Sequence, residues 1–152
     1  MIKIITLLVV YLVSSTVAVQ LKYISCGSTA TVHSIALEPC ASEPCAMNIG
    51  QNYTVWVNFT AKVNHDRAYH VWGGDVTGFG DVIMLNINPN DACIQSVKCP
   101  IQAGLQQTYK ATVTIPYINP KRMALTWEVK STNDPAARPI ICFVFPVTIL
   151  VN

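Results

Sequence analysis

The sequence predicts an all-β protein with the architecture of an immunoglobulin-like β-sandwich, built from two antiparallel sheets. Several segments alternate apolar and polar residues, turn-forming residues separate them, and no convincing long helix is found. The 152 residues are 51% hydrophobic and only 12% charged, against about 25% charged residues in typical soluble proteins. This composition fits one apolar-rich domain and excludes an intrinsically disordered chain.

The first segment has the composition of a secretory signal peptide. Lys3 gives a short positive start, residues 4–13 are apolar except for Thr6, and small residues follow up to Ala18. The competing interpretation is a membrane anchor, but ten apolar residues cross only about half of a hydrocarbon layer roughly 30 Å thick. We therefore expect a signal peptide over residues 1–18 and a single domain over residues 19–152.

The clearest strand signal covers residues 52–63. Its odd positions are apolar and its even positions are polar apart from Trp56, which is typical of a half-buried antiparallel strand. The segment also contains two N-glycosylation sequons, at Asn52 and Asn58. Both asparagines lie on the polar side of the alternation, where a glycan would remain in water.

Three later segments repeat this alternation. Their apolar positions are Tyr109, Ala111, Val113 and Ile115, then Met123, Leu125, Trp127 and Val129, and finally Phe143, Phe145, Val147, Ile149 and Val151. Residues that favour turns separate the strands, at positions 73–75, 88–91, 119–120 and 133–135. Because each strand offers one apolar face, two sheets packed face to face are expected.

Six cysteines in a secreted chain predict three disulfides. Spacing alone permits fifteen pairings. Short loops make the Cys40–Cys45 and Cys93–Cys99 bridges geometrically easy, which would leave Cys26 to pair with Cys142. A zinc site is the alternative, but the paired short spacings that zinc sites use are missing. We expect no metal.

Little in the sequence points to catalysis, to a cofactor or to nucleic acid. The ten basic residues are scattered, so no stripe that could follow phosphates is present. The Gly-Phe-Gly sequence at 78–80 lacks the rest of a dinucleotide fingerprint. A hydrolase that uses His65 or His70 is the weakest hypothesis, since His65 and Asp66 lie in a polar segment typical of an exposed turn. We expect a protein that is not an enzyme and has no cofactor.

Two apolar segments occupy places where connections between strands are expected. They are residues 82–87 and residues 116–120, and the second is bracketed by prolines. Because connections normally run over the surface and are polar, these segments could form the rim of an entrance for a hydrophobic ligand. They could equally pack as strand ends in a closed core.

Several of these motifs together resemble the ML lipid-recognition domain, and within it the Niemann-Pick type C2 sterol-transfer proteins and the group 2 mite allergens. The resemblance covers residues 19–152. It rests on the order of the six cysteines and on the sequence motifs Cys-Gly-Ser at 26–28, Asn-Pro-Asn-Asp-Ala-Cys at 88–93, Cys-Pro-Ile-Gln at 99–102, and Phe-Pro-Val at 145–147. It implies disulfides Cys26–Cys142, Cys40–Cys45 and Cys93–Cys99.

The resemblance also implies a lipid cavity between the two sheets. Its lining would be Tyr53, Val55, Val57, Ile115, Trp127, Phe143 and Phe145, all on the side of the alternation that the pattern assigns to the interior. Leu85 would lie at the entrance, where the family has a phenylalanine, together with Tyr117 and Ile118. The smaller leucine and the shifted aromatic residue would change the shape of this gate.

The expected function is therefore that of a secreted, soluble carrier that binds a sterol or another lipid. It would release this ligand through transient contact with a membrane or a membrane receptor, act as a monomer, and possess no nucleic-acid partner. Its destination would be the extracellular fluid or, after delivery, the endolysosomal lumen. The alternative is a secreted immune or chemosensory protein that presents a lipid to a receptor.

Overall fold

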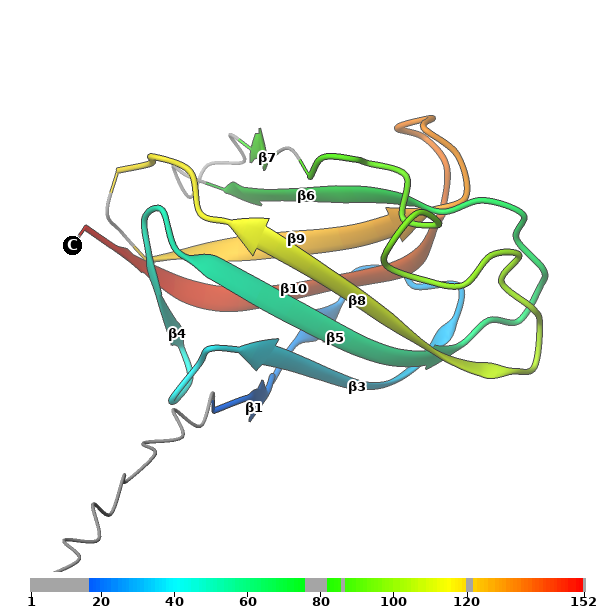
Figure 1. Cartoon of the computed structure of the whole chain (residues 1–152), viewed down its shortest axis with the longest axis horizontal. Helices are drawn as coiled ribbons and strands as arrows, with labels where there is room; N and C mark the ends of the chain where they lie inside the picture. Colours follow the sequence, from blue (N-terminus) through cyan, green and yellow to red (C-terminus); the bar gives the residue numbers. More distant parts are fainter. Residues whose placement is uncertain (1–16, 76–81, 86, 120–121, 152) are drawn as a thin grey trace, which may run out of the picture.

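The computed structural model describes residues 17–75, 82–85, 87–119 and 122–151, and in these ranges it consists of two β-sheets packed face to face (Figure 1). The smaller sheet has the strand order β1-β3-β5-β8, and its neighbouring strands are antiparallel. Its strands are β1 (Val19–Gln20), β3 (Thr31–Glu38), β5 (Asn52–Thr60) and β8 (Gln106–Thr114). The all-β sandwich predicted from the sequence is thus confirmed.

The larger sheet has the strand order β2-β10-β9-β6-β7, with neighbours again antiparallel. Its strands are β2 (Ile24–Ser25), β10 (Pro139–Leu150), β9 (Arg122–Lys130), β6 (Tyr69–Asp75) and β7 (Val82–Leu85). A further strand, β4 (Cys45–Asn48), pairs with β10 in parallel. This pairing departs from the purely antiparallel arrangement that the sequence predicted.

The inward positions follow the predicted alternation along the central strands. In β5 the odd positions from Tyr53 to Phe59 are buried, and the same holds in β8, β9 and most of β10. The prediction fails at the strand ends. Val63 is 57% exposed because β5 ends at Thr60, where its last pair with β8 is made, and Val151 is 58% exposed because it follows the end of β10.

Residues 73–75 do not form the predicted turn but complete strand β6. The glycine at position 74 is explained by close packing. A Cβ atom added there would lie 2.0 Å from Cε of Met123 and 3.0 Å from Cδ2 of Leu125, distances at which the packing would have to shift. The glycine thus lies against the side-chain ends of Met123 and Leu125 from the neighbouring strand rather than at a reversal of the chain.

The apolar segment that follows was also expected to be a connection, but residues Val82–Leu85 form strand β7. Its backbone pairs with β6 in the register Trp72↔Leu85 and Asp75↔Val82. The other apolar segment, at 116–119, does form a connection in its described part.

The three disulfides join Cys26 to Cys142, Cys40 to Cys45, and Cys93 to Cys99, which confirms the pairing that the resemblance implied. The first bridge ties the segment after β2 to β10, and the other two close short loops.

Residues 1–16 lie outside the described part of the chain, so the signal peptide stays a prediction. Over the described ranges, no helix has the length and apolar character needed to cross a membrane.

We predict unequal effects when the disulfides are removed one at a time. The Cys26–Cys142 bridge spans 116 residues and the Cys93–Cys99 bridge spans 6. In the chain-entropy model, losing the first should lower the free energy of unfolding by about 5 kcal/mol and losing the second by about 2 kcal/mol. Denaturant unfolding of the two Cys→Ala double variants measures both, and equal losses would contradict this ranking.

Candidate functional site

The inward faces of the two sheets bring together most of the residues predicted to line a lipid cavity. They belong to one continuous buried cluster and are each at most 9% exposed. They are Tyr53, Val55 and Val57 from β5, Ile115 and Ile118 after β8, Trp127 from β9, and Phe143 and Phe145 from β10. Tyr117 is instead 80% exposed. Leu85 belongs to β7, and its side chain lies outside what the structure describes.

Aromatic side chains form a row across the inner face of the larger sheet. The register aligns Trp72 of β6 with Trp127 of β9, and Trp127 with Phe143 of β10. The ring centroids of the two tryptophans are 5.4 Å apart, and those of Trp127 and Phe143 are 6.4 Å apart with nearly parallel planes. Phe145 extends the row, with its ring 5.8 Å from that of Phe143. The sheet thus presents a broad, rigid apolar surface to the interior.

Trp72 is a candidate site residue that the sequence analysis missed. It is 1% exposed and lies on the inner side of β6, between the buried residues His70 and Gly74. The alternation of these three inward residues was the available signal. It was hidden because two adjacent glycines indicated a turn at that point.

A buried polar cluster beside this row joins the two sheets. Trp127 Nε1 donates to the hydroxyl of Tyr109 at 3.0 Å, and the same hydroxyl lies 2.5 Å from Nδ1 of His70. Tyr109 belongs to β8 of the smaller sheet, whereas His70 and Trp127 belong to the larger sheet. Because the tyrosine proton needs an acceptor, this geometry favours a neutral His70 that accepts it at Nδ1.

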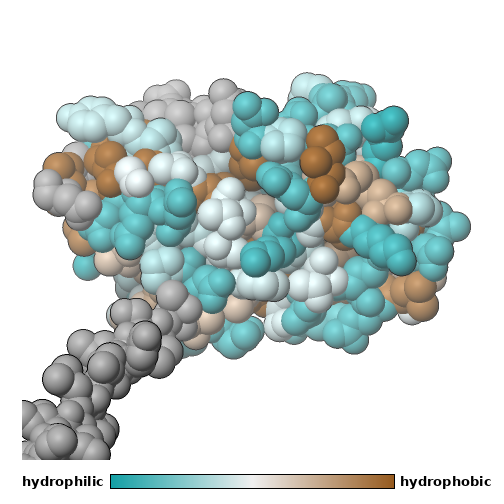
Figure 2. All heavy atoms as spheres, in the orientation of Figure 1, coloured by the Kyte–Doolittle hydropathy of each residue, from teal (hydrophilic) through white to brown (hydrophobic). Residues whose placement is uncertain are grey.

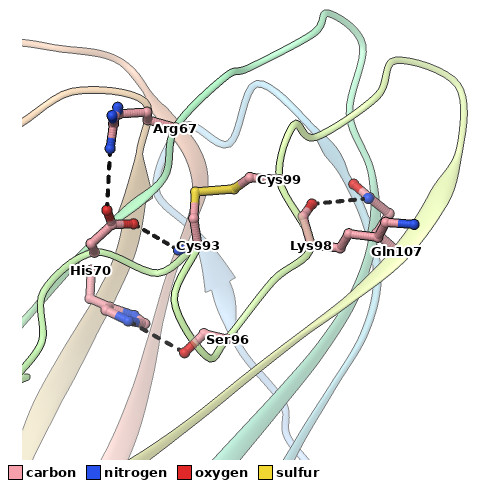
Figure 3. The surroundings of a disulfide bond; sticks show 8 residues. Arg67, His70, Cys93, Ser96, Lys98, Cys99 and Gln107 are labelled. Carbon is pink, nitrogen blue, oxygen red and sulfur yellow. Dashed lines mark hydrogen bonds and ion pairs between the residues drawn. A yellow bond between two sulfur atoms is a disulfide. The ribbon is translucent and has the colours of Figure 1, made fainter.

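The loop closed by the Cys93–Cys99 disulfide completes this cluster (Figure 3). The side chain of His70 extends toward this loop, and its Nε2 lies 3.4 Å from Oγ of Ser96. The carboxylate of Asp91 accepts a hydrogen bond from the backbone N–H of Cys93 and lies 3.5 Å from Arg67. The loop thereby holds Ser96 against the imidazole.

Burial shifts the proton affinities within the cluster. Desolvation lowers the pKa of His70 to about 4, although the negative charge of Asp91 opposes this shift. Desolvation also raises the pKa of Tyr109, which the hydrogen bond from Trp127 partly opposes. Both groups are therefore neutral near pH 7, as an apolar interior requires.

The buried histidine does not offer an accessible catalytic arrangement. His70 and Ser96 are 5% and 6% exposed, so their contact is closed to a substrate in solution. His65 lies in a surface loop, with its backbone bridged to Ile101, and partial burial lowers its pKa. Asp66 beside it is exposed. In the described ranges, no group of three or more His, Cys, Asp or Glu residues is placed to hold a metal ion.

The hydroxyl of Tyr53 joins the two sheets at another place. It accepts a hydrogen bond from the backbone N–H of Asn48 at 2.9 Å and lies 3.3 Å from the carbonyl oxygen of Ala46. Both partners belong to β4 of the larger sheet, while Tyr53 belongs to β5 of the smaller sheet. Tyr53 therefore directs its ring to the interior and its polar end to this junction.

The outer face of the smaller sheet is polar, and Figure 2, which views the molecule from this side, shows mostly teal and white surface there. Asn52 and Asn58 lie on this face. Asn52 is exposed, whereas Asn58 is half-buried and both ends of its amide are engaged, by Ser34 at 2.9 Å and by Thr108 at 2.7 Å.

Hollows also occur on the outer face of the larger sheet. One, of about 380 Å³, lies beside the turn at 133–135, and its Lys130 is paired with Glu128 at 3.2 Å and with the carbonyl oxygen of Pro135 at 2.8 Å. The other, of about 410 Å³, lies between Tyr23, Ile24 and Pro146. Both open away from the inward faces, so neither corresponds to the predicted lipid site.

The buried imidazole predicts a stability that depends on pH. The pKa of His70 in the folded protein lies below its unfolded value of 6.5, so its contribution is complete above about pH 6.5 and is lost as the pH falls toward 4. Between pH 7.5 and 4.5, the free energy of unfolding should fall by about 2 to 3 kcal/mol more in the wild type than in His70→Gln. Denaturant titrations at the two pH values measure this difference, and parallel losses would contradict it.

The two sequons should differ in occupancy. Asn52 is exposed and its Oδ1 accepts a hydrogen bond from Thr114 at 2.6 Å, which a glycan on Nδ2 leaves in place, whereas a glycan on Nδ2 of the half-buried Asn58 would compete with the contact of that atom to Ser34. We predict that Asn52→Gln removes most of the glycan mass of the protein secreted from eukaryotic cells and that Asn58→Gln removes less. Intact-mass spectrometry before and after enzymatic deglycosylation measures both, and the reverse order would refute the prediction.

Comparison with known proteins places this chain in a family. Residues 20–149 match the family model of the ML domain. The chain is 28% identical over 137 residues to a protein of Danio rerio named NPC intracellular cholesterol transporter 2, with 89% of each chain covered. It is 27% identical to the protein of the same name from Bos taurus, covering 90% of this chain and 89% of that one.

A solved structure shows the same fold. The crystal structure of a Niemann-Pick type C2 protein from the Japanese carpenter ant superposes with a TM-score of 0.71 and 20% identity, covering 85% of this chain and 99% of that one. The match to the family model begins in β1 and ends within β10, and the two-sheet architecture agrees with that of the ant protein. The chain belongs to the ML domain family.

Proposed function

We propose that this protein is a secreted lipid carrier that binds a sterol or a fatty-chain lipid between its two sheets and transfers it to a membrane or a partner protein. The observation that carries the proposal is the continuous apolar inner surface, with its aromatic row at Trp72, Trp127 and Phe143. The names of the relatives, which describe cholesterol transporters, support the sterol class.

The energetics of such a site favour a lipid ligand. Burying about 400 Å² of apolar ligand surface contributes on the order of 10 kcal/mol before the cost of association is subtracted. Useful affinity then requires few polar contacts. Rigid aromatic rings such as Trp127 and Phe143 supply this contact area with little loss of side-chain entropy.

The gate in this proposal is formed by Leu85 of β7 and by Tyr117 and Ile118 in the connection after β8. Tyr117 is 80% exposed while its neighbour Ile118 is 9% exposed, so this connection offers one aromatic side chain to the surroundings and one apolar side chain to the interior. An exposed tyrosine at the rim suits transient contact with a membrane interface or with a receptor.

The compartment and the assembly are part of the same proposal. Three disulfides suit an oxidising environment such as the extracellular fluid or, after delivery, the endolysosomal lumen. We propose that one copy of the chain carries one ligand without a partner subunit and without a cofactor.

The test of the gate is a charge placed at its centre. In Leu85→Asp, an unpaired carboxylate would lie on the path of an apolar ligand, and loading of cholesterol from donor vesicles should fall at least about tenfold because that charge must be desolvated. The matched control is Ile24→Asp, which introduces the same charge at a 74% exposed apolar residue on the outer face of the larger sheet.

The measurement is the rate and extent of cholesterol transfer between vesicles, with circular dichroism to verify that both variants fold. We expect Ile24→Asp to load cholesterol normally and Leu85→Asp to lose loading. Unchanged uptake by Leu85→Asp would overturn the gate assignment. Failure of the wild type to load either cholesterol or a fatty-chain lipid would overturn the proposed function itself.

A further inference from the structure

The indole nitrogen of Trp72 is a buried hydrogen-bond donor without a partner among the described residues. The side chain is 1% exposed, so water does not satisfy it from outside. Leaving such a donor unpaired costs about 1 to 3 kcal/mol, and buried polar groups of native proteins are therefore nearly always paired. An unpaired donor at this position calls for an acceptor.

The other two tryptophans of the chain, in contrast to Trp72, have hydrogen-bond partners for their indole nitrogens. Trp127 Nε1, on the neighbouring strand, donates to Tyr109 at 3.0 Å. Trp56 Nε1, on the outer face of the smaller sheet, donates to Glu38 Oε1 at 3.0 Å. A second buried atom without a partner, Oε1 of Gln107, belongs to an amide whose nitrogen already donates to the carbonyl oxygen of Lys98.

The position of Trp72 connects this donor to the lipid path. Its ring stacks at a tilt against Trp127, 5.4 Å away, within the aromatic row. Its backbone pairs with Leu85, the residue assigned to the gate. A ligand lying along this row would therefore pass Trp72 one strand inside the gate.

We propose that Trp72 Nε1 donates a hydrogen bond to a neutral oxygen of the bound lipid, a hydroxyl or a carbonyl, and so determines which lipids this chain prefers. The inference rests on the proposed function, because it requires a ligand between the sheets. Trp72 thereby becomes a specificity-determining residue, and the preferred ligand is an apolar body with one neutral acceptor rather than a pure hydrocarbon.

The surrounding charges favour a neutral acceptor over a carboxylate. Among the described residues, the only buried positively charged side chain is Lys130, which is held by Glu128 and Pro135 on the outer side of β9. His70, the buried histidine of the interior, accepts from Tyr109 in its neutral form. One indole N–H cannot offset the cost of desolvating a full negative charge.

The test uses ligands that differ only in the acceptor. Affinities are measured for cholesterol and for cholest-5-ene, which lacks the hydroxyl, and for hexadecan-1-ol, hexadecane and hexadecanoate at pH 7, all delivered from cyclodextrin. The wild type should prefer each hydroxyl-bearing ligand over its hydrocarbon by about three- to tenfold and should bind hexadecanol more tightly than hexadecanoate. Trp72→Phe should abolish the preference, whatever its absolute affinity for the hydrocarbons.

Trp127→Phe is the matched control, because it removes a neighbouring indole whose N–H is already satisfied. The ratio between hydroxyl-bearing and hydrocarbon ligands should survive in this variant, whatever its absolute affinity. Equal binding of alcohol and hydrocarbon by the wild type, an unchanged ratio in Trp72→Phe, or tighter binding of hexadecanoate would overturn the inference and leave the carrier function standing. No binding of any of these lipids would overturn both.

A measurement on the unmutated protein keeps the inference testable if Trp72→Phe fails to fold. The chain has three tryptophans, so its ¹H–¹⁵N spectrum contains three indole signals. Replacing hexadecane by hexadecan-1-ol in the loaded protein should move the signal of Trp72 downfield, in the direction of a new hydrogen bond, and leave that of Trp56 in place. An unmoved Trp72 signal would count against the proposal.

Discussion

The structure depends on the exclusion of water from the space between the two sheets. Each strand sends alternate side chains to opposite faces, so a period of two in the sequence produces one apolar layer and one polar layer per sheet. Where two apolar layers meet, a polar atom between them costs free energy unless it finds a hydrogen-bond partner. The hydroxyl of Tyr109 and the imidazole of His70 are joined to one another, whereas the indole nitrogen of Trp72 has no partner among the described residues.

The polar contacts between the sheets also make the two ends of the sandwich different. The hydroxyl of Tyr53 joins β5 to β4, and the Tyr109 cluster joins β8 to β6 and β9 beside the Cys93–Cys99 loop. In Figure 1, β6 and β8 both run away from that loop, toward the part of the molecule where β7 and the connection after β8 lie. Loading a ligand there would leave the buried polar cluster undisturbed, whereas opening the other end would expose it.

The sequence predicted the parts of the fold that depend on local signals. The alternation in β5, β8, β9 and β10, together with the family resemblance, led to the sandwich, to the disulfides and to the inward positions. The errors arose where tertiary contacts decide the outcome. The glycine at 74 reflects contact with Met123 and Leu125, two residues far along the chain, so a local interpretation as a turn was wrong.

The same reasoning explains what the sequence missed at the site. Nothing local indicates that His70 bonds to Tyr109, 39 residues away, or that the indole nitrogen of Trp127 has a partner while that of Trp72 has none within the described ranges. Such differences depend on the distance between two sheets, and the alternation of residues along one strand carries no information about it. They nevertheless decide which polar groups are left for a ligand.

Native mass spectrometry of the protein purified from the medium of secreting cells, followed by extraction and identification of whatever dissociates from it, tests the central claim most directly. A complex of one chain with one sterol or fatty-chain lipid, lost on denaturation, is the predicted result. A bare chain that stays bare after incubation with both lipid classes would contradict the account.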